Sequence, residues 1–291
     1  MVKQIQRYLK YFYYIYYFIG MSKVNMSLSR AAATSALRDI DYTNPLSWEF
    51  SGFSQSGGDG IIDILTRKLL SPNRYFIEIG ANDGIENNTA WLAFARRYTG
   101  IMVDGNPKLS WRCNYLLSPL CLIDTINLFV NKDNIDVIKN KALYINPDVF
   151  SIDIDGIDYY VVEAFLKFGF RPKIIVVEYN SAFGPSESIT IEYRENIYPE
   201  REKGRFPVVY WGCSLNGWKT LLLKHGYKFL TVDSNGVDAF FIDPGEFSGQ
   251  FIKQLKKGID FRDNFSTFWF YKNSWDKQFN LMKDLPFFKI R

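Results

Sequence analysis

Apolar runs of strand length alternate with helical patterns from Tyr75 onward, and this alternation constrains the fold more than any other feature. Strands separated by helices pair in parallel, and the helices then cover both faces of the sheet. The expected strands are residues 75–80, 100–105, 120–127, 149–155 and 173–180, with helices at NTAWLAFARRY, KLSWRCNYLL, NIDVIKNKAL and DYYVVEAFLKFG.

Two closely spaced strands, YKFLTVD and DAFFIDP, follow a fifth helix, SLNGWKTLLLKHG. They are joined by SNGV, whose glycine permits a tight reversal, so they form an antiparallel hairpin. Five parallel strands closed by such a hairpin are the layout of class I S-adenosylmethionine methyltransferases. We therefore expect an α/β fold, a Rossmann-like three-layer sandwich with a mostly parallel sheet.

The chain has 291 residues, enough for one large domain with additions. We expect a basic aromatic N-terminal extension over residues 1–40 and the α/β domain over residues 41–245. Residues 246–291 should form a helical and aromatic cap that packs on the same domain.

The formal net charge of +4 is unevenly distributed, because six bases precede the first acid, Asp39. The remainder is slightly acidic, which argues against a nucleic-acid-binding body. The cysteines, Cys113, Cys121 and Cys213, lack metal-ligand spacing, so we expect ordinary thiols in a reducing compartment, the cytoplasm.

An apolar, tyrosine-rich run, residues 11–21, gives the N-terminus a membrane character. It is too short to span a bilayer, and no small-residue cleavage site follows it. Aromatic rings beside bases suit an interfacial helix on an anionic membrane, which would make residues 3–23 a peripheral membrane contact. The alternative is a poorly ordered extension upstream of a start at Met21.

The loop in FIEIGANDGIENNT follows the first strand and opens the first helix. Gly80 and Gly84 let the backbone approach a ligand, and the helix start supplies N–H groups. Glu78 and Asp83 would repel a dinucleotide's phosphates but suit the cationic S-adenosylmethionine. Asp104, which ends the second strand, could accept hydrogen bonds from ribose hydroxyls. The alternative is a structural turn followed by a surface acid.

A second group of acids, in VFSIDIDGIDYY, ends the fourth strand. Asp153 and Asp155 alternate with isoleucines and should point to one side of the strand, near Glu178 and Asn180 of the fifth. Oxygen ligands of this kind suit Mg²⁺ or Mn²⁺, so these acids either hold a divalent cation or act as general base. Asp158 fits the start of the next helix better.

The order of several motifs resembles FkbM-type S-adenosylmethionine-dependent methyltransferases. The motifs are FSQSGGDGIIDIL, FIEIGANDGIENNT, SIDIDGIDYYVVEAF, IIVVEYNSAFGP, GCSL and GVDAFFI. The resemblance implies O-methylation of a hydroxyl, such as that of a sugar, glycan or glycolipid. It also implies that a leading helix with Ser54, Gln55 and Asp59 covers the site and that the cofactor is lined by Glu78, Gly80, Asn82, Asp83, Gly84 and Asp104. Asp124 of the third strand is a further cofactor-binding candidate.

The sequence departs from this family at Asp238, where members of the branch commonly carry asparagine. Substrate contacts are expected in residues 181–212, a polar and aromatic segment that follows the fifth strand. The single histidine, His225, is expected to cap a helix rather than to act in catalysis. Two other functions stay open: a metal-dependent glycosyltransferase that uses Asp153 and Asp155, and an inactive binding module.

Overall fold

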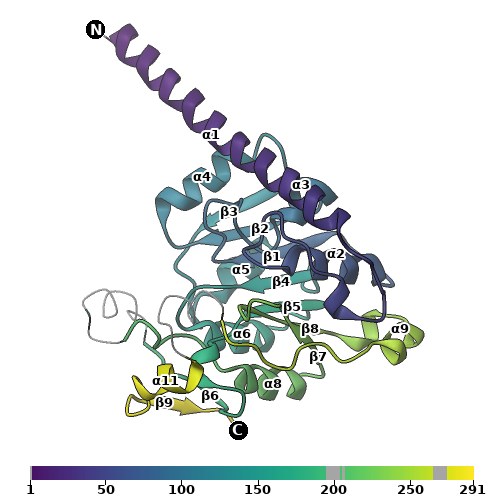
Figure 1. The fold of residues 1–291 in the computed structure, drawn as a ribbon. Helices are drawn as coiled ribbons and strands as arrows, with labels where there is room; N and C mark the ends of the chain where they lie inside the picture. The colour runs from purple at the N-terminus through teal and green to yellow at the C-terminus, as the bar shows by residue number, and fades with distance from the viewer. Residues whose placement is uncertain (1, 195–203, 205–206, 265–273) are drawn as a thin grey trace.

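The structure, a computed structural model, describes residues 2–194, 204, 207–264 and 274–291, without the side chains of residues 2–10, 12 and 13. A seven-stranded sheet in the order β3-β2-β1-β4-β5-β8-β7 forms its centre (Figure 1). β3, β2, β1, β4 and β5 are parallel, and β8 is antiparallel to both of its neighbours. This confirms the predicted class I methyltransferase fold, in which an antiparallel hairpin closes a parallel sheet.

The strands lie close to their predicted positions, with two differences. β3 begins at Ile123 rather than at residue 120, and β4 ends at Ile152, so the acids predicted to lie on this strand follow it instead. The strands of the main sheet are β1 (Tyr75–Ile79), β2 (Thr99–Asp104), β3 (Ile123–Asn127), β4 (Val149–Ile152), β5 (Ile174–Glu178), β7 (Lys228–Val232) and β8 (Asp238–Ile242).

Helices cover both faces of the sheet and complete three layers. Successive side chains point to opposite faces, so Phe76 and Met102 pack in one core layer and Ile77 and Val103 in the other. Because both faces are buried, the strands read as continuous apolar runs. The first layer packs against α2 (Gly58–Lys68), α3 (Ala90–Arg96) and α4 (Pro107–Leu117), and the second against α5 (Ile135–Lys141), α6 (Asp158–Lys167) and α8 (Leu215–Lys224).

The N-terminal segment forms one long helix, α1 (Val2–Ala36), whose first half extends beyond the body of the molecule in Figure 1. Its second half packs on the body through buried positions such as Gly20, Val24 and Ala31. A Cβ at Gly20 would lie 2.2 Å from a methyl carbon of Leu116 on α4, so a larger residue there would force the Leu116 side chain to shift. Among the described helices, none is both long enough and apolar enough to cross a membrane.

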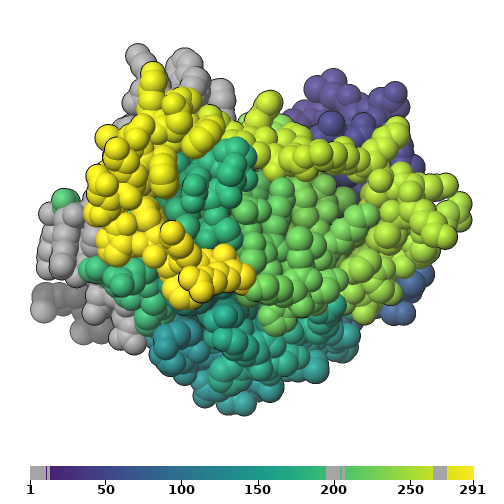
Figure 2. Space-filling model, turned by 90° about the horizontal axis from the view of Figure 1, so that it is seen from below, coloured from purple at the N-terminus to yellow at the C-terminus, as the bar shows by residue number. Residues whose placement is uncertain are grey.

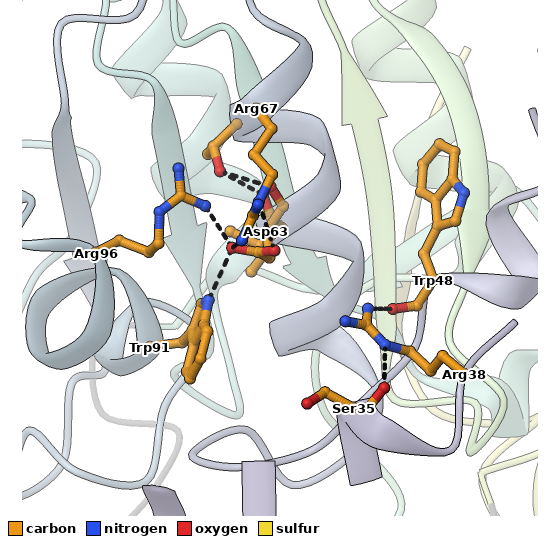
Figure 3. Close-up of polar contacts among 9 residues, drawn as sticks. Ser35, Arg38, Trp48, Asp63, Arg67, Trp91 and Arg96 are labelled. Carbon is orange, nitrogen blue, oxygen red and sulfur yellow. Dashed lines mark hydrogen bonds and ion pairs between the residues drawn. The ribbon is translucent and has the colours of Figure 1, made fainter. Parts of the chain in front are cut away.

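A hydrogen-bonded ion cluster fastens α2 to α3 (Figure 3). The buried carboxylate of Asp63 accepts hydrogen bonds from Trp91 Nε1 at 3.1 Å and Arg67 Nε at 2.9 Å, and it pairs with Arg96. In the same view, Arg38 donates to a backbone carbonyl oxygen of the loop before α2. These contacts fix the segment between α1 and α2 beside the body.

The segment after β5 and the C-terminal residues pack against each other. β6 (Ile189–Ile191) pairs antiparallel with β9 (Phe287–Lys289) in a second, two-stranded sheet. Figure 2 shows the yellow C-terminal residues lying along the teal and green surface of the body. The remaining short elements of the described residues are η1 (Pro45–Ser47), η2 (Ser181–Phe183), η3 (Pro244–Glu246), α9 (Gly249–Gln254) and α11 (Trp275–Asn280).

Candidate functional site

A cavity of about 450 Å³ opens at the carboxyl ends of the parallel strands. The strand order reverses between β1 and β4, and ligands of open α/β sheets bind at such a switch point. The volume suits a nucleoside-sized ligand. The cavity is lined by Gln55, Ile79, Gly80, Asn82, Glu86, Val103, Asp104, Gly105, Asn106, Leu109, Leu128, Phe129, Val130, Asn131, Asp153, Ile154, Asp155 and Ile157.

The glycine loop approaches β4 closely at Gly80, which has a φ of +87°. A Cβ there would lie 1.7 Å from the carbonyl oxygen of Asp153, so glycine is required both by the left-handed backbone and by the available space. Gly84 is also left-handed, with Leu117 and Cys113 in the position of a side chain. Gly80 lines the cavity, whereas Gly84 serves the packing of the loop on α4.

Asp104 lies at the end of β2 and lines the cavity. Its carboxylate accepts hydrogen bonds from the backbone N–H groups of Asn82 at 2.9 Å and Asn106 at 2.7 Å. Partial burial raises the pKa of Asp104, and these two donors oppose that rise. The glycine loop and the start of α4 thus hold this acid at the cavity wall, where hydroxyl groups of a ligand can reach it.

Glu78 and Asp83, both predicted to line the cofactor, occupy other places. Glu78 is buried in β1 and lines a second, small cavity of about 30 Å³, together with Asp238. Ser151 Oγ donates to Glu78 Oε1 at 3.2 Å, and Oε2 has no hydrogen-bond partner among the described residues. Asp83 turns toward α1 and forms a 3.0 Å ion pair with Lys23.

Asp124 lies away from this cavity. In the register of the sheet it pairs with Ile101, whereas the cavity residue Asp104 pairs with Asn127, at the other end of β3. Asp124 is exposed and is not among the lining residues. The structure therefore does not bring this predicted cofactor-binding residue to the candidate site.

The acids after β4 and β5 do come together. Carboxylate oxygens of Asp153, Asp155 and Glu178 lie within 4.8 Å of one another. The predicted alternation of Asp153 and Asp155 along a strand is wrong, because β4 ends at Ile152 and Asp155 has a left-handed φ of 54°. A turn, rather than a pleated strand, places Asp155 beside the other two acids.

Burial and like charge favour the protonated forms of Asp153 and Glu178. Burial, followed by the charges of Asp155 and Asp158, raises the pKa of Asp153 to about 7. Burial and the charge of Asp153 raise the pKa of Glu178 well above its usual range. Glu178 Oε2 is buried without a hydrogen-bond partner among the described residues, so this cluster can accept a proton or a cation.

Asp158 and Asn180 serve the backbone. The Asp158 carboxylate accepts hydrogen bonds from the N–H groups of Ile154 and Gly156, both at 2.9 Å, at the start of α6. Asn180 caps η2 and donates to two backbone carbonyl oxygens of residues 209–211. Asp158 thus takes the structural role that the sequence favoured, while Asn180 is not part of the acid cluster.

Of the three residues predicted to lie on the leading helix, Ser54 and Gln55 lie in the loop before α2, and only Gln55 reaches the cavity. Gln55 lines both the main and the small cavity. Asp59, fully buried at the start of α2, accepts hydrogen bonds from the N–H groups of Gly52, Phe53 and Ser54 at 2.6, 2.6 and 3.1 Å. Asp59 therefore fastens the loop that carries Gln55.

Several cavity residues were missed by the sequence reasoning. Leu109 and Phe129 give the cavity an apolar wall, and Phe129 packs over Gly105. Glu86 adds a carboxylate that lines both cavities. Phe129 could have been predicted to line the cavity from its position just after β3, because the carboxyl ends of all parallel strands face the same crevice.

The described part of the predicted substrate segment and the single histidine do not line this cavity. Residues 195–203 and 205–206 of that segment fall outside the described residues, and its described part does not line the cavity. His225 follows α8 as its C-cap residue and lines a different cavity, which Arg291 also lines. Burial lowers the pKa of His225.

Comparisons with known proteins gave structural similarity only. No protein-family model and no curated protein matches the chain. An O-methyltransferase from Bacillus cereus, solved with SAH, is 18% identical with a TM-score of 0.42, over 76% of this chain and 89% of that one. Aeropyrum pernix fibrillarin, solved with S-adenosyl-L-methionine, is 12% identical with a TM-score of 0.39, over 59% and 67% of the two chains. Similarity at this level assigns no activity to this chain.

Proposed function

We propose that the protein is an S-adenosylmethionine-dependent methyltransferase that transfers the methyl group to a hydroxyl. The observation that carries the proposal is the cavity at the β1/β4 switch point, with Asp104 held on one wall and Asp153 and Asp155 on the other. The cavity thus combines carboxylates with the apolar side chains of Leu109 and Phe129. This combination suits a ligand with ribose hydroxyls, an aromatic base and a positive charge.

The residues that would hold the cofactor follow from the chemistry of each group. Asp104 would accept hydrogen bonds from the ribose hydroxyls, and Gly80 and Asn82 would bring backbone close to the ligand. Leu109 and Phe129 offer the apolar surface that a base requires. The acids Asp153, Asp155 and Glu86 would face the cationic end. When bound, S-adenosylmethionine supplies an electrophilic methyl group.

The acid cluster would act on the acceptor. A hydroxyl is a weak nucleophile at neutral pH, so it gains from a base that takes its proton as the new C–O bond forms. Asp153 has a pKa raised to about 7 by burial and neighbouring charge, which suits a base near neutral pH. Alternatively, Asp153, Asp155 and Glu178 would hold Mg²⁺ or Mn²⁺, which would polarise the hydroxyl.

The acceptor class rests on the family resemblance. Sugars, glycans and glycolipids offer hydroxyls of this kind, and the raised pKa values of Asp153 and Glu178 would serve any of them. A metal-dependent glycosyltransferase that uses Asp153 and Asp155 is less well supported. The phosphates of a sugar nucleotide would need cations beside them, whereas the end of β2 places the carboxylate of Asp104 next to the glycine loop.

Calorimetry with two ligands tests the cofactor. We expect S-adenosylhomocysteine to bind and a uridine sugar nucleotide not to bind. Binding of the nucleotide sugar alone would replace the proposal by the glycosyltransferase. Binding of neither ligand would contradict both proposed enzyme activities and favour an inactive module.

A metal titration separates the two roles of the acid cluster. If a cation is required, Mg²⁺ or Mn²⁺ should bind the wild type and not the Asp155→Asn variant, and exhaustive chelation should abolish methyl transfer. Full methyl transfer after chelation would show that no metal is required, and Asp153 would then act as the general base.

A further inference from the structure

The small cavity beside the candidate site is lined mainly by acids and amides. Its volume is about 30 Å³, and four of its lining residues, Gly80 and Asp153 among them, also line the main cavity. No lysine, arginine or histidine is among the described residues that line it, so the cavity favours a positively charged group. The lining residues are Gln55, Glu78, Gly80, Glu86, Asn87, Asn88, Asp153, Val237 and Asp238.

The central sheet brings three of these acids to one face. Phe76 of β1 and Phe240 of β8 pack in the same core layer. Glu78 and Asp238 are each two residues from one of them, so their side chains point to that same face, and both are buried. β4 and β5 lie between β1 and β8, and Asp153 directly follows β4. The carboxylates therefore come from separate strands and meet in one small space.

One carboxylate oxygen of Glu78 lacks a hydrogen-bond partner. Asn88 Nδ2 donates to Ser151 Oγ at 3.3 Å, and Ser151 Oγ donates to Glu78 Oε1 at 3.2 Å. Glu78 Oε2 is buried without a partner among the described residues, although the residue is only 1% exposed. Burial of an acceptor oxygen without a donor is unfavourable, so a ligand that brings an N–H group into the cavity would remove this cost.

An ammonium group fits this cavity better than a metal ion does. Among the described residues, the group of three acids whose oxygens lie close enough to share an ion is Asp153, Asp155 and Glu178, without Glu78 or Asp238. A divalent ion needs several oxygens at about 2.0–2.6 Å, whereas an ammonium group offers three N–H donors at hydrogen-bond distance. A volume of about 30 Å³ holds one or two groups of the size of water, so only the ammonium end of a ligand enters.

We propose that the small cavity binds a primary ammonium group of the methyl acceptor, so that the acceptor is a hydroxyl compound with an amine, such as an amino sugar. The inference rests on the proposed function and adds the charge of the acceptor to it. The ammonium group donates to Glu78 Oε2, with the carboxylates of Asp153 and Asp238 around it. The reacting hydroxyl lies in the main cavity, next to Asp153, which lines both cavities.

A bound ammonium group also offsets the cost of burying these acids. Burial raises the pKa of Glu78 to about 8, and burial and the charge of Asp233 raise that of Asp238 well above its usual range. A cation beside them stabilises the ionised carboxylates and so opposes both shifts.

Ligand-detected NMR on the protein saturated with S-adenosylhomocysteine tests the inference. Glucosamine, glucose and N-acetylglucosamine are compared at a pH at which the glucosamine amine is protonated. We expect glucosamine to bind at least about tenfold more tightly than the other two sugars, which carry no positive charge. Equal affinities in a protein that binds S-adenosylhomocysteine would overturn this inference alone. Failure of S-adenosylhomocysteine to bind would overturn the proposed function, and this inference with it.

The cofactor-free protein provides a further comparison. If saturation with S-adenosylhomocysteine abolished the binding of glucosamine, the small cavity would belong to the amino group of the cofactor, and the inference would be wrong. We expect the affinity for glucosamine to be the same or higher in the saturated protein, because the acceptor and the cofactor occupy neighbouring spaces.

Asp238→Asn keeps the shape of the side chain and removes its charge. The variant should bind glucosamine about tenfold more weakly and should bind glucose and S-adenosylhomocysteine as the wild type does. The matched control is Asp124→Asn, which removes an exposed acid that lines neither cavity and should change none of the three affinities. Circular dichroism checks the fold of both variants. An unchanged preference for glucosamine in folded Asp238→Asn would contradict the inference, and the wild-type comparison of the three sugars decides it if this variant does not fold.

Discussion

At the scale of single residues, the candidate site depends on how the backbone orients acids. Asp104 is held by two N–H donors at the cavity wall, whereas Asp124 lies on the next strand and does not line this cavity. Both are acids at the end of an apolar run, so composition alone does not separate them. Their places in the sheet distinguish them, because Asp104 ends β2 whereas Asp124 lies near the start of β3.

Exchange of Asp104 for asparagine should weaken the binding of S-adenosylhomocysteine by about tenfold or more. An asparagine keeps one acceptor oxygen but loses the charge, and a hydrogen bond to a charged group contributes about 1.5–3 kcal/mol. Calorimetry gives the dissociation constant directly. Asp124→Asn is the matched control and should bind like the wild type; the reverse order of the two variants would contradict the placement of the ribose.

Glu78 should make stability depend on pH. Burial raises its pKa from 4.5 to about 8, so the folded state keeps a proton that the unfolded chain releases across this window. The folded state then binds more protons, and the free energy of unfolding falls as pH rises from about 4.5 to 8. Urea unfolding at several pH values should show this fall in the wild type and a flatter profile in Glu78→Gln. Parallel profiles would mean that Glu78 is ionised in the folded protein.

At the scale of elements, the contact between α2 and α3 depends on a buried charge. Asp63 is 4% exposed at its side chain and is shared by Arg67, Arg96 and Trp91. Loss of one partner leaves the others uncompensated, which costs more than loss of a surface ion pair. The leading segment with Gln55 depends on the same helix, so this charge also supports the cavity.

The Asp63→Ala variant should therefore lose about 3 kcal/mol of unfolding free energy. Arg67→Ala is the comparison within the same cluster, because the Arg67 side chain is 54% exposed; it should cost less than about 1 kcal/mol. Chemical denaturation measures both. Equal losses would show that the cluster is stabilised by the surface pair and not by the buried carboxylate.

At the scale of the whole molecule, the second sheet joins the C-terminus to the segment after β5. Ile290 is buried, and its backbone N–H donates to the carbonyl oxygen of Ser188 at 2.9 Å. This connection lies outside the cavity. Stability and cofactor binding should therefore respond separately to changes in it.

Removal of residues 286–291 should lower the melting temperature by roughly 5 °C or more, because a buried isoleucine and one strand of the sheet are lost. The dissociation constant of S-adenosylhomocysteine should stay unchanged. Leu120→Ser, at an exposed position, controls for the loss of apolar surface and should leave the melting temperature unchanged. A weaker cofactor complex in the truncated protein would show that the cap supports the cavity.

The sequence alone determined the fold class and two residues of the cavity wall, Gly80 and Asp104. The strands, the helices between them and the closing hairpin can be predicted from the periodicity of apolar residues, because that periodicity reflects the local geometry of the backbone. Gly80 and Asp104 were predictable for the same reason, since each directly follows or ends a strand whose carboxyl end faces the crevice.

Only the tertiary structure decided which acids meet. Asp155 joins Asp153 and Glu178 through a left-handed turn after β4, and Asp83 pairs with Lys23 of a helix sixty residues earlier. Glu86 and Phe129 enter the cavity from loops whose path no periodicity encodes. Strand and helix patterns reflect contacts between near neighbours in the chain, whereas the position of a loop side chain depends on what the rest of the molecule packs against it.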